Sequence, residues 1–137
     1  MRKVRSFLLR VPKGAELLSF LKEFARKNEI KKAAVFAIGS FEDATLAYYD
    51  LETRRYEPIE VKERTELVSL SGNISLMDGE PFPHVHAVLS RRDGSTVGGH
   101  LMRASVFMVE LYVTEVPGPL LERKPWEHGL KVWELEG

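Results

Sequence analysis

The chain has 137 residues, of which 44% are apolar, and this composition fits one globular domain with a sizeable core rather than a disordered chain. Its 20 basic and 20 acidic residues give a formal net charge of zero, which argues against a protein that holds nucleic acid mainly through phosphates. Cysteine is absent, so disulfides and thiolate metal sites are excluded. Residues 1–7 show no signal-peptide core and no apolar run reaches membrane-spanning length, so we expect a single cytoplasmic domain over residues 1–137.

The first half of the chain predicts one strand, one helix and then further strands. Residues 6–11 are apolar and end at Pro12, which predicts a short strand. Residues 15–27 predict a helix with an apolar stripe at helical spacing, formed by Leu17, Leu18, Leu21, Phe24 and Ala25. Residues 32–38 are almost continuously apolar, as in a strand buried on both faces, and residues 44–49 and 56–61 predict two more strands.

Residues 67–76 alternate strictly and predict a strand with two unlike faces. Val68, Leu70, Ile74 and Leu76 would share the core face, while Ser69, Ser71, Asn73 and Ser75 would share the other. Small hydroxyl and amide groups pack a core poorly. The polar row therefore predicts a subunit interface, a ligand wall or a face open to solvent.

Three of the four histidines lie within residues 84–100 and predict a metal site. His84 and His86 alternate with apolar residues along a strand, so their side chains point the same way. Arg92, Asp93 and Gly94 predict a three-residue hairpin loop with Gly94 in the left-handed position, and this loop places His86 opposite His100. A two-residue turn would shift the register by one and send His100 to the opposite face.

The strand after the hairpin carries one further candidate ligand. If residues 103–105 form a loop between two strands, Gly98 pairs with Glu110 and this carboxylate lies one diagonal from His100. Three roles are then open to it: a fourth metal ligand, a hydrogen-bond partner of an imidazole, or half of an ordinary ion pair.

The rest of the chain predicts little chemistry. A break at residues 117–119 precedes a short helical turn within residues 120–126 and a last strand at residues 130–136, and His128 is expected on the surface. One helix and about eight mostly hairpin-linked strands predict an α+β fold, an antiparallel sheet with a covering helix.

Several segments together resemble the PPC domain, the plant- and prokaryote-conserved domain also called domain of unknown function 296 (DUF296). The similar stretches are residues 38–41, 48–50, 67–75, 82–87 and 97–101. The histidines make the chain similar to the stand-alone prokaryotic or archaeal type. The resemblance implies an antiparallel sheet flanked by helices and assembly as a homotrimer.

In plants, the PPC domain accompanies AT-hook motifs in DNA-binding proteins and engages partner proteins. The present chain contains no Arg-Gly-Arg-Pro core of an AT-hook. The resemblance therefore implies a trimeric binding or regulatory module with a protein or DNA partner. Any DNA binding is expected to be weak and salt-sensitive.

The histidines leave open which kind of metalloprotein this is. His84, His86 and His100 are expected to bind a divalent ion, zinc in the first place, because imidazole suits zinc and three protein ligands leave one position open. One hypothesis is a regulatory trimer that holds a metal. A related hypothesis is a purely structural trimer that the metal stabilises. The alternative is a zinc-dependent enzyme such as a small hydrolase, with Glu110 or Glu42 as base.

Overall fold

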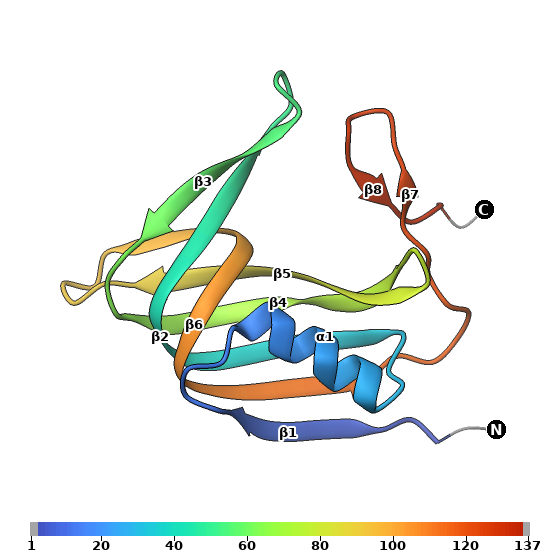
Figure 1. The fold of residues 1–137 in the computed structure, drawn as a ribbon, viewed down its shortest axis with the longest axis horizontal. Helices are drawn as coiled ribbons and strands as arrows, with labels where there is room; N and C mark the ends of the chain where they lie inside the picture. Colours follow the sequence, from blue (N-terminus) through green and yellow to red (C-terminus); the bar gives the residue numbers. More distant parts are fainter. Residues whose placement is uncertain (1–2, 136–137) are drawn as a thin grey trace.

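One bent antiparallel sheet organises the protein, whose structure is a computed structural model that describes residues 3–135 (Figure 1). The elements are β1 (Ser6–Val11), α1 (Leu17–Lys27), β2 (Ala33–Asp50), β3 (Arg55–Val61), β4 (Thr65–Met77), β5 (Glu80–Ser90), β6 (Thr96–Glu115), β7 (Lys124–Pro125) and β8 (Lys131–Val132). The order in the main sheet is β1-β6-β5-β4-β2-β3, with β6 also paired to β2, and β7 pairs with β8. The expected α+β class is confirmed.

Two long strands, β2 and β6, replace four shorter strands that the sequence predicted. Strand β2 spans both the 32–38 and the 44–49 segments, and β6 runs without interruption through residues 103–105. The expected loop at residues 103–105 is therefore wrong. Those residues pair with residues 43–45 of β2, and the buried Ala104 lies opposite Ala44. Gly, Pro, Asn and Asp are all absent from residues 103–105, so no turn chemistry ends the strand there.

The pairing of β2 with β6 makes the sheet curl. The two strands stay paired from Ala33 opposite Glu115 to Ala47 opposite His100, with register shifts near residues 40–43 and 45–46. Such bulges bend a strand and increase its twist. The first half of β6 therefore reaches β5, while its second half pairs with β1.

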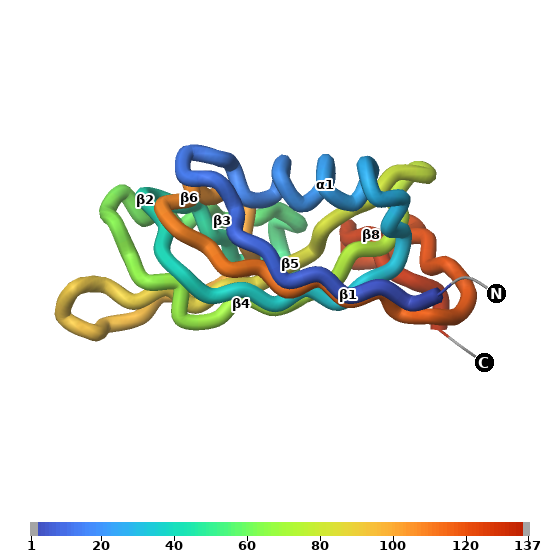
Figure 2. Tube along the Cα trace, turned by 90° about the horizontal axis from the view of Figure 1, so that it is seen from below, coloured from blue at the N-terminus to red at the C-terminus, as the bar shows by residue number. Residues whose placement is uncertain are grey.

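Helix α1 covers one face of the sheet and leaves the other face without a helix (Figure 2). Leu17, Leu21 and Ala25 of the predicted stripe are buried in the core, while Leu18 and Phe24 pack against it at the edge. The sheet contributes the inward residues of β2, β4, β5 and β6 to the same core.

Glu16 caps α1 and ties it to the sheet. Its carboxylate accepts hydrogen bonds from the amides of Leu18 at 3.1 Å and Ser19 at 2.9 Å, and from the amide of Ala104 in β6 at 3.0 Å. Partial burial acts to raise the pKa of Glu16, but these amide donors outweigh burial and lower it. The helix therefore begins at Leu17, two residues later than predicted.

A bulge in β4 changes one part of the predicted core. The register of β4 against β5 shifts between Leu67 and Ser69, so Leu67 turns inward and Val68 is half exposed. Leu70 and Ile74 remain in the core as predicted.

The C-terminal segment returns to the far end of β4 rather than leaving the domain. The amide of Leu76 donates to the carbonyl of Leu121, and the amide of Arg123 donates to the carbonyl of Leu76. Residues 120–126 are extended, so the predicted helical turn is wrong. The last described strand covers residues 131–132, and residue 136 of the predicted one lies outside the described residues. None of the helices in residues 3–135 is both long and apolar enough to cross a membrane.

Candidate functional site: a histidine cluster in an aromatic cavity

The β5–β6 hairpin brings the three histidines together in the predicted register. Gly94 has a φ of +85°, its amide donates to the carbonyl of Arg91, and the amide of Arg91 donates to the carbonyl of Ser95. This three-residue loop places His86 directly opposite His100. The alternative register, shifted by one residue with His100 on the opposite face, is thereby excluded.

The three imidazoles face one another closely enough to share an ion. Their ring centroids are 5.2 Å apart for His84 and His86, 5.4 Å for His84 and His100, and 5.6 Å for His86 and His100. One ligand atom from each lies within 4.8 Å of the others. The Nδ1 atom of His100 is buried without a hydrogen-bond partner among the described residues. A buried imidazole nitrogen that lacks a partner fits a role as metal ligand.

The polar row of β4 adjoins this cluster. Across the β4–β5 pairing, Ser71 lies opposite His86 and Asn73 lies opposite His84, so all four side chains share one face. Ser75 is fully buried at the end of the row, where its hydroxyl accepts a hydrogen bond from the indole of Trp133 at 3.0 Å. Ser69 and Ser71 are exposed. In the single chain the row is therefore open to solvent at Ser69 and Ser71 and buried at Ser75, and its use as a subunit interface or ligand wall stays a prediction.

Arg123 of the C-terminal segment lies against the histidine cluster. Its Nη2 atom donates to Oδ1 of Asn73 at 3.1 Å and lies 3.4 Å from Nδ1 of His84. Its guanidinium also lies 5.5 Å from the ring centre of Phe82 and 4.9 Å from that of Trp133. No spacing signal pointed to Arg123, because this residue lies 23 positions beyond His100 in a segment without a recognisable motif.

Tyrosines of the β2–β3 hairpin form the opposite wall. Tyr56 stacks on His100 with 4.6 Å between ring centroids, and Tyr49 packs on Tyr56 at 4.9 Å. The hydroxyl of Tyr49 donates to the carbonyl of His128 at 2.7 Å. The contact of these tyrosines with the histidines was not predicted from the sequence.

These walls enclose a cavity of about 820 Å³ that opens beside the imidazoles. Its lining residues are Ala47, Tyr48, Tyr49, Leu51, Tyr56, Met77, Phe82, His84, His86, Gly99, His100, Arg123, Gly129, Leu130, Lys131 and Val132. None of them is an aspartate or a glutamate. The volume lies in the range of cavities that hold small organic molecules.

The surroundings keep two of the imidazoles in the neutral form that binds metals. Burial lowers the pKa of His84 to about 4, and the neighbouring charges of Arg123, His100 and His86 act in the same direction. Burial, with a smaller contribution from His86, also lowers the pKa of His100. On the walls, burial raises the pKa of Tyr56 and lowers that of Arg123.

The metal-free protein is expected to lose stability as the pH falls from about 6.5 to 4. In this window an unfolded histidine binds a proton, whereas folded His84 stays neutral until about pH 4, so protonation favours the unfolded state. A difference of one bound proton between the unfolded and the folded state changes the free energy of unfolding by about 1.4 kcal/mol per pH unit. Because His84 is partly solvated, its contribution to this slope is smaller. Urea unfolding of chelator-treated protein at several pH values measures the slope. His84→Asn should flatten it, and an unchanged slope would contradict this assignment.

Glu110 and Glu42 do not join the site. Because β6 is continuous, Glu110 pairs with Arg10 and Ile38 instead of Gly98, so the predicted diagonal contact with His100 is wrong. Neither carboxylate lines the cavity. Among the described residues, the cluster with ligand geometry consists of His84, His86 and His100.

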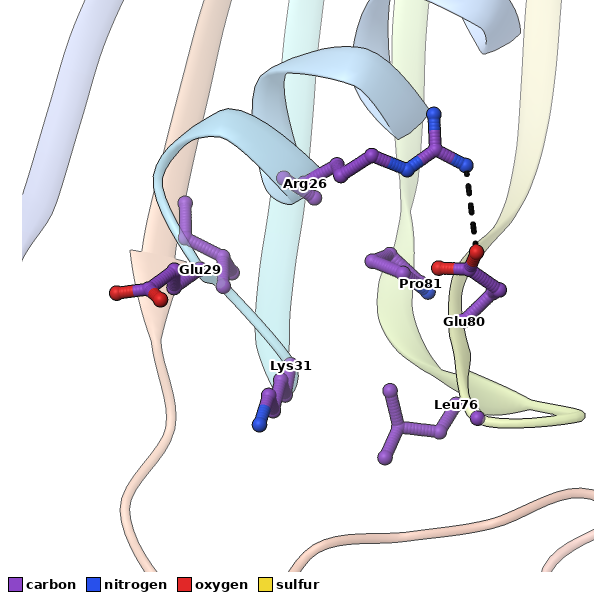
Figure 3. A pocket seen from close by; sticks show the side chains of 9 residues that line it. Arg26, Glu29, Lys31, Leu76, Glu80 and Pro81 are labelled. Atoms are coloured by element: carbon purple, nitrogen blue, oxygen red, sulfur yellow. Dashed lines mark ion pairs between the residues drawn. The ribbon is translucent and has the colours of Figure 1, made fainter.

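A second and smaller hollow, of about 140 Å³, lies between the end of α1 and the β4–β5 turn (Figure 3). The Arg26 guanidinium reaches across it to the carboxylate of Glu80 at 3.7 Å, and it also pairs with Glu23 at 3.0 Å. Histidine is absent from its lining. Its arginine is already paired with two carboxylates, so the cavity beside the histidines is the better functional candidate.

The comparisons with known proteins agree with this geometry. The model of the Plants and Prokaryotes Conserved (PCC) domain matches residues 1–117. The plant- and prokaryote-conserved protein from Pyrococcus horikoshii is 40% identical, with a TM-score of 0.95 over 100% of this chain and 96% of that chain. The metal-containing protein from Archaeoglobus fulgidus is 39% identical, with a TM-score of 0.92 over 97% of this chain and 96% of that one.

A candidate DNA-binding protein from Ralstonia eutropha is 25% identical, with a TM-score of 0.85 over 94% of this chain and 90% of that one. A search of curated proteins gave no match. The resemblance read from the sequence is confirmed.

Proposed function

Because this chain belongs to the Plants and Prokaryotes Conserved domain family, we propose that it is a metal-binding module in which His84, His86 and His100 hold one divalent ion, most readily zinc. The observation that carries the proposal is the convergence of three imidazole ligand atoms within 4.8 Å. The metal-containing relative from Archaeoglobus fulgidus supports it. Three neutral imidazoles suit zinc and leave one coordination position free.

Two of the three histidines have distinct parts in such a site. His86 shares a strand with His84 and a cross-strand pair with His100, so it joins the two halves of the cluster. Stacking on Tyr56 orients the ring of His100. When bound, zinc supplies a Lewis acid beside the cavity.

Zinc titration of chelator-treated protein, followed by calorimetry, tests the metal proposal. One zinc ion per chain should bind, and metal analysis of the dialysed product should return the same ratio. A chain that binds no zinc, nickel or cobalt above background would overturn the proposal.

We further propose that the module is a homotrimer assembled through the sheet face that α1 leaves open. Large apolar side chains are exposed on this face: Leu8, Tyr112 and Phe36 follow one another across β1, β6 and β2, next to Ser71 of β4. Leu8 is 81% exposed in the single chain. An apolar surface of this kind is typical of a protein–protein interface.

Light scattering at micromolar concentration should give three times the chain mass. Phe36→Glu places a charge in the middle of the proposed interface and should shift the protein to smaller species. Lys22→Glu on the exposed side of α1 is the matched control and should leave the mass unchanged. A monomeric wild type would contradict the trimer.

A DNA partner is the weaker part of the proposal. The relative from Ralstonia eutropha supports it, but the zero net charge of this chain does not. We expect weak, sequence-indifferent binding that is lost as salt rises, because only local basic groups can contact phosphates. A mobility-shift assay at physiological salt measures this, and a tight preferred site would refute it.

The cavity beside the histidines favours one alternative, a zinc-dependent enzyme that acts on a small molecule. A hydrolase that uses Glu110 or Glu42 as base loses support, because neither residue lines the cavity. An enzyme of this kind would have to position its substrate with the tyrosines, Arg123 and the histidines instead.

A further inference from the structure

The charge of the cavity wall is one-sided. Arg123 and Lys131 line the cavity together with the three histidines, and none of the acidic residues that the structure describes does. Lys131 has a distant partner, Asp78, at 3.9 Å. A cavity with cationic and aromatic walls favours an anionic ligand with an apolar body.

Arg123 is held in place but its charge is not neutralised. Within residues 3–135, no ion pair joins Arg123 to a carboxylate, and its buried Nε atom has no hydrogen-bond partner. Contacts with Phe82, Trp133 and Asn73 fix the guanidinium at the cavity wall. Arg123 as a whole is only partly buried, but a partly desolvated cation without a counter-charge still gains from a ligand that supplies one.

The contact between Arg123 and His84 links this cation to the metal site. In the structure, Nη2 of Arg123 lies 3.4 Å from Nδ1 of His84, and an arginine can only donate. If His84 binds a metal through Nε2, its Nδ1 carries the proton and can no longer accept. If it binds through Nδ1, that lone pair is already used. In both cases Arg123 loses an acceptor.

From these observations we infer that the cavity binds a small organic carboxylate with an apolar or aromatic body, and that Arg123 pairs with the carboxylate when the histidines hold their metal. The inference rests on the proposed metal site and names the ligand class that site accepts. Tyr49, Tyr56 and Phe82 contact the apolar body of the ligand. Its carboxylate accepts the hydrogen bond from Arg123 that Nδ1 of His84 can no longer accept. Metal and carboxylate therefore favour each other's binding.

Benzoate and its neutral analogue benzamide test the inference on the full chain. Calorimetry with zinc-loaded protein should show benzoate binding at least about tenfold more tightly than benzamide, the usual effect of a charge-assisted hydrogen bond. Chelator-treated protein should show a smaller preference. Equal affinities for the two compounds would overturn the inference.

Arg123→Met keeps an unbranched apolar stem but removes the charge, and it should abolish the preference for benzoate. Arg123→Lys retains the charge without the planar fork and should retain part of the preference. Arg92→Met, at the exposed tip of the β5–β6 loop and outside the cavity lining, is the matched control and should behave like wild type. Full preference in Arg123→Met, with thermal unfolding like that of wild type, would overturn the role of Arg123.

The zinc titration separates this inference from the metal proposal. If zinc binds and benzoate is not preferred, the carboxylate site is wrong and the metal site stands. If zinc does not bind, the coupling to metal is overturned. Benzoate binding that depends on Arg123 in that sample would still support the carboxylate site, and its absence would overturn it.

Discussion

Replacing His86 by alanine is expected to weaken zinc binding by more than about 100-fold, because it removes the ligand that is common to the strand pair and the cross-strand pair. The ring of His86 lies 5.2 Å from that of His84 and 5.6 Å from that of His100. Without it, two imidazoles remain, one fewer than the three protein ligands that zinc keeps even in its open sites. Competition with a chromophoric chelator at pH 7.5 measures the change in affinity.

His128→Ala is the matched control, because it removes an imidazole outside the cluster. The ring of His128 packs on Trp126. The hydrogen bond from Tyr49 goes to the backbone carbonyl of His128, which the substitution leaves in place. This variant should therefore bind zinc like wild type. His86 is exposed, so His86→Ala should keep the fold of the metal-free protein. Equal zinc affinity in the two variants would eliminate the proposed site.

Gly72→Ala is expected to destabilise the metal-free protein by about 3 kcal/mol or more and to abolish zinc binding, because the added methyl group separates two paired strands. A Cβ atom at Gly72 would lie 2.0 Å from the carbonyl oxygen of His84 and 2.7 Å from the Cα of Val85. Both are backbone atoms of β5, so no side-chain rotation relieves the clash. The strand must move, and His84 moves with it.

Urea unfolding of the chelated protein and zinc titration at low temperature measure the two effects. Ser69→Ala, at an exposed position of the same strand, is the control and should change stability by less than about 0.5 kcal/mol. Wild-type stability in Gly72→Ala would show that β4 and β5 do not approach as closely as the structure indicates.

The histidine hairpin could be predicted from the sequence because its determinants are local. Alternation along residues 84–89 places His84 and His86 on one face, since side chains alternate in any strand. The three-residue loop ending at Gly94 then sets the register, and the register alone places His100 opposite His86. The stripe of α1 was equally predictable, because its period of 3.6 residues is a property of the helix itself.

The contacts that turn the histidine cluster into a lined cavity depend on long-range packing. A bulged pairing with β2 keeps β6 continuous, and this removes Glu110 from the histidine face. Curvature of the β2–β3 hairpin brings Tyr56 onto His100, and the returning C-terminal segment brings Arg123 to His84. These contacts join residues more than 35 positions apart and depend on how strands bend, which periodicity and turn chemistry do not encode. The sequence by itself therefore determined the three-histidine cluster, whereas the tertiary structure decided what surrounds it.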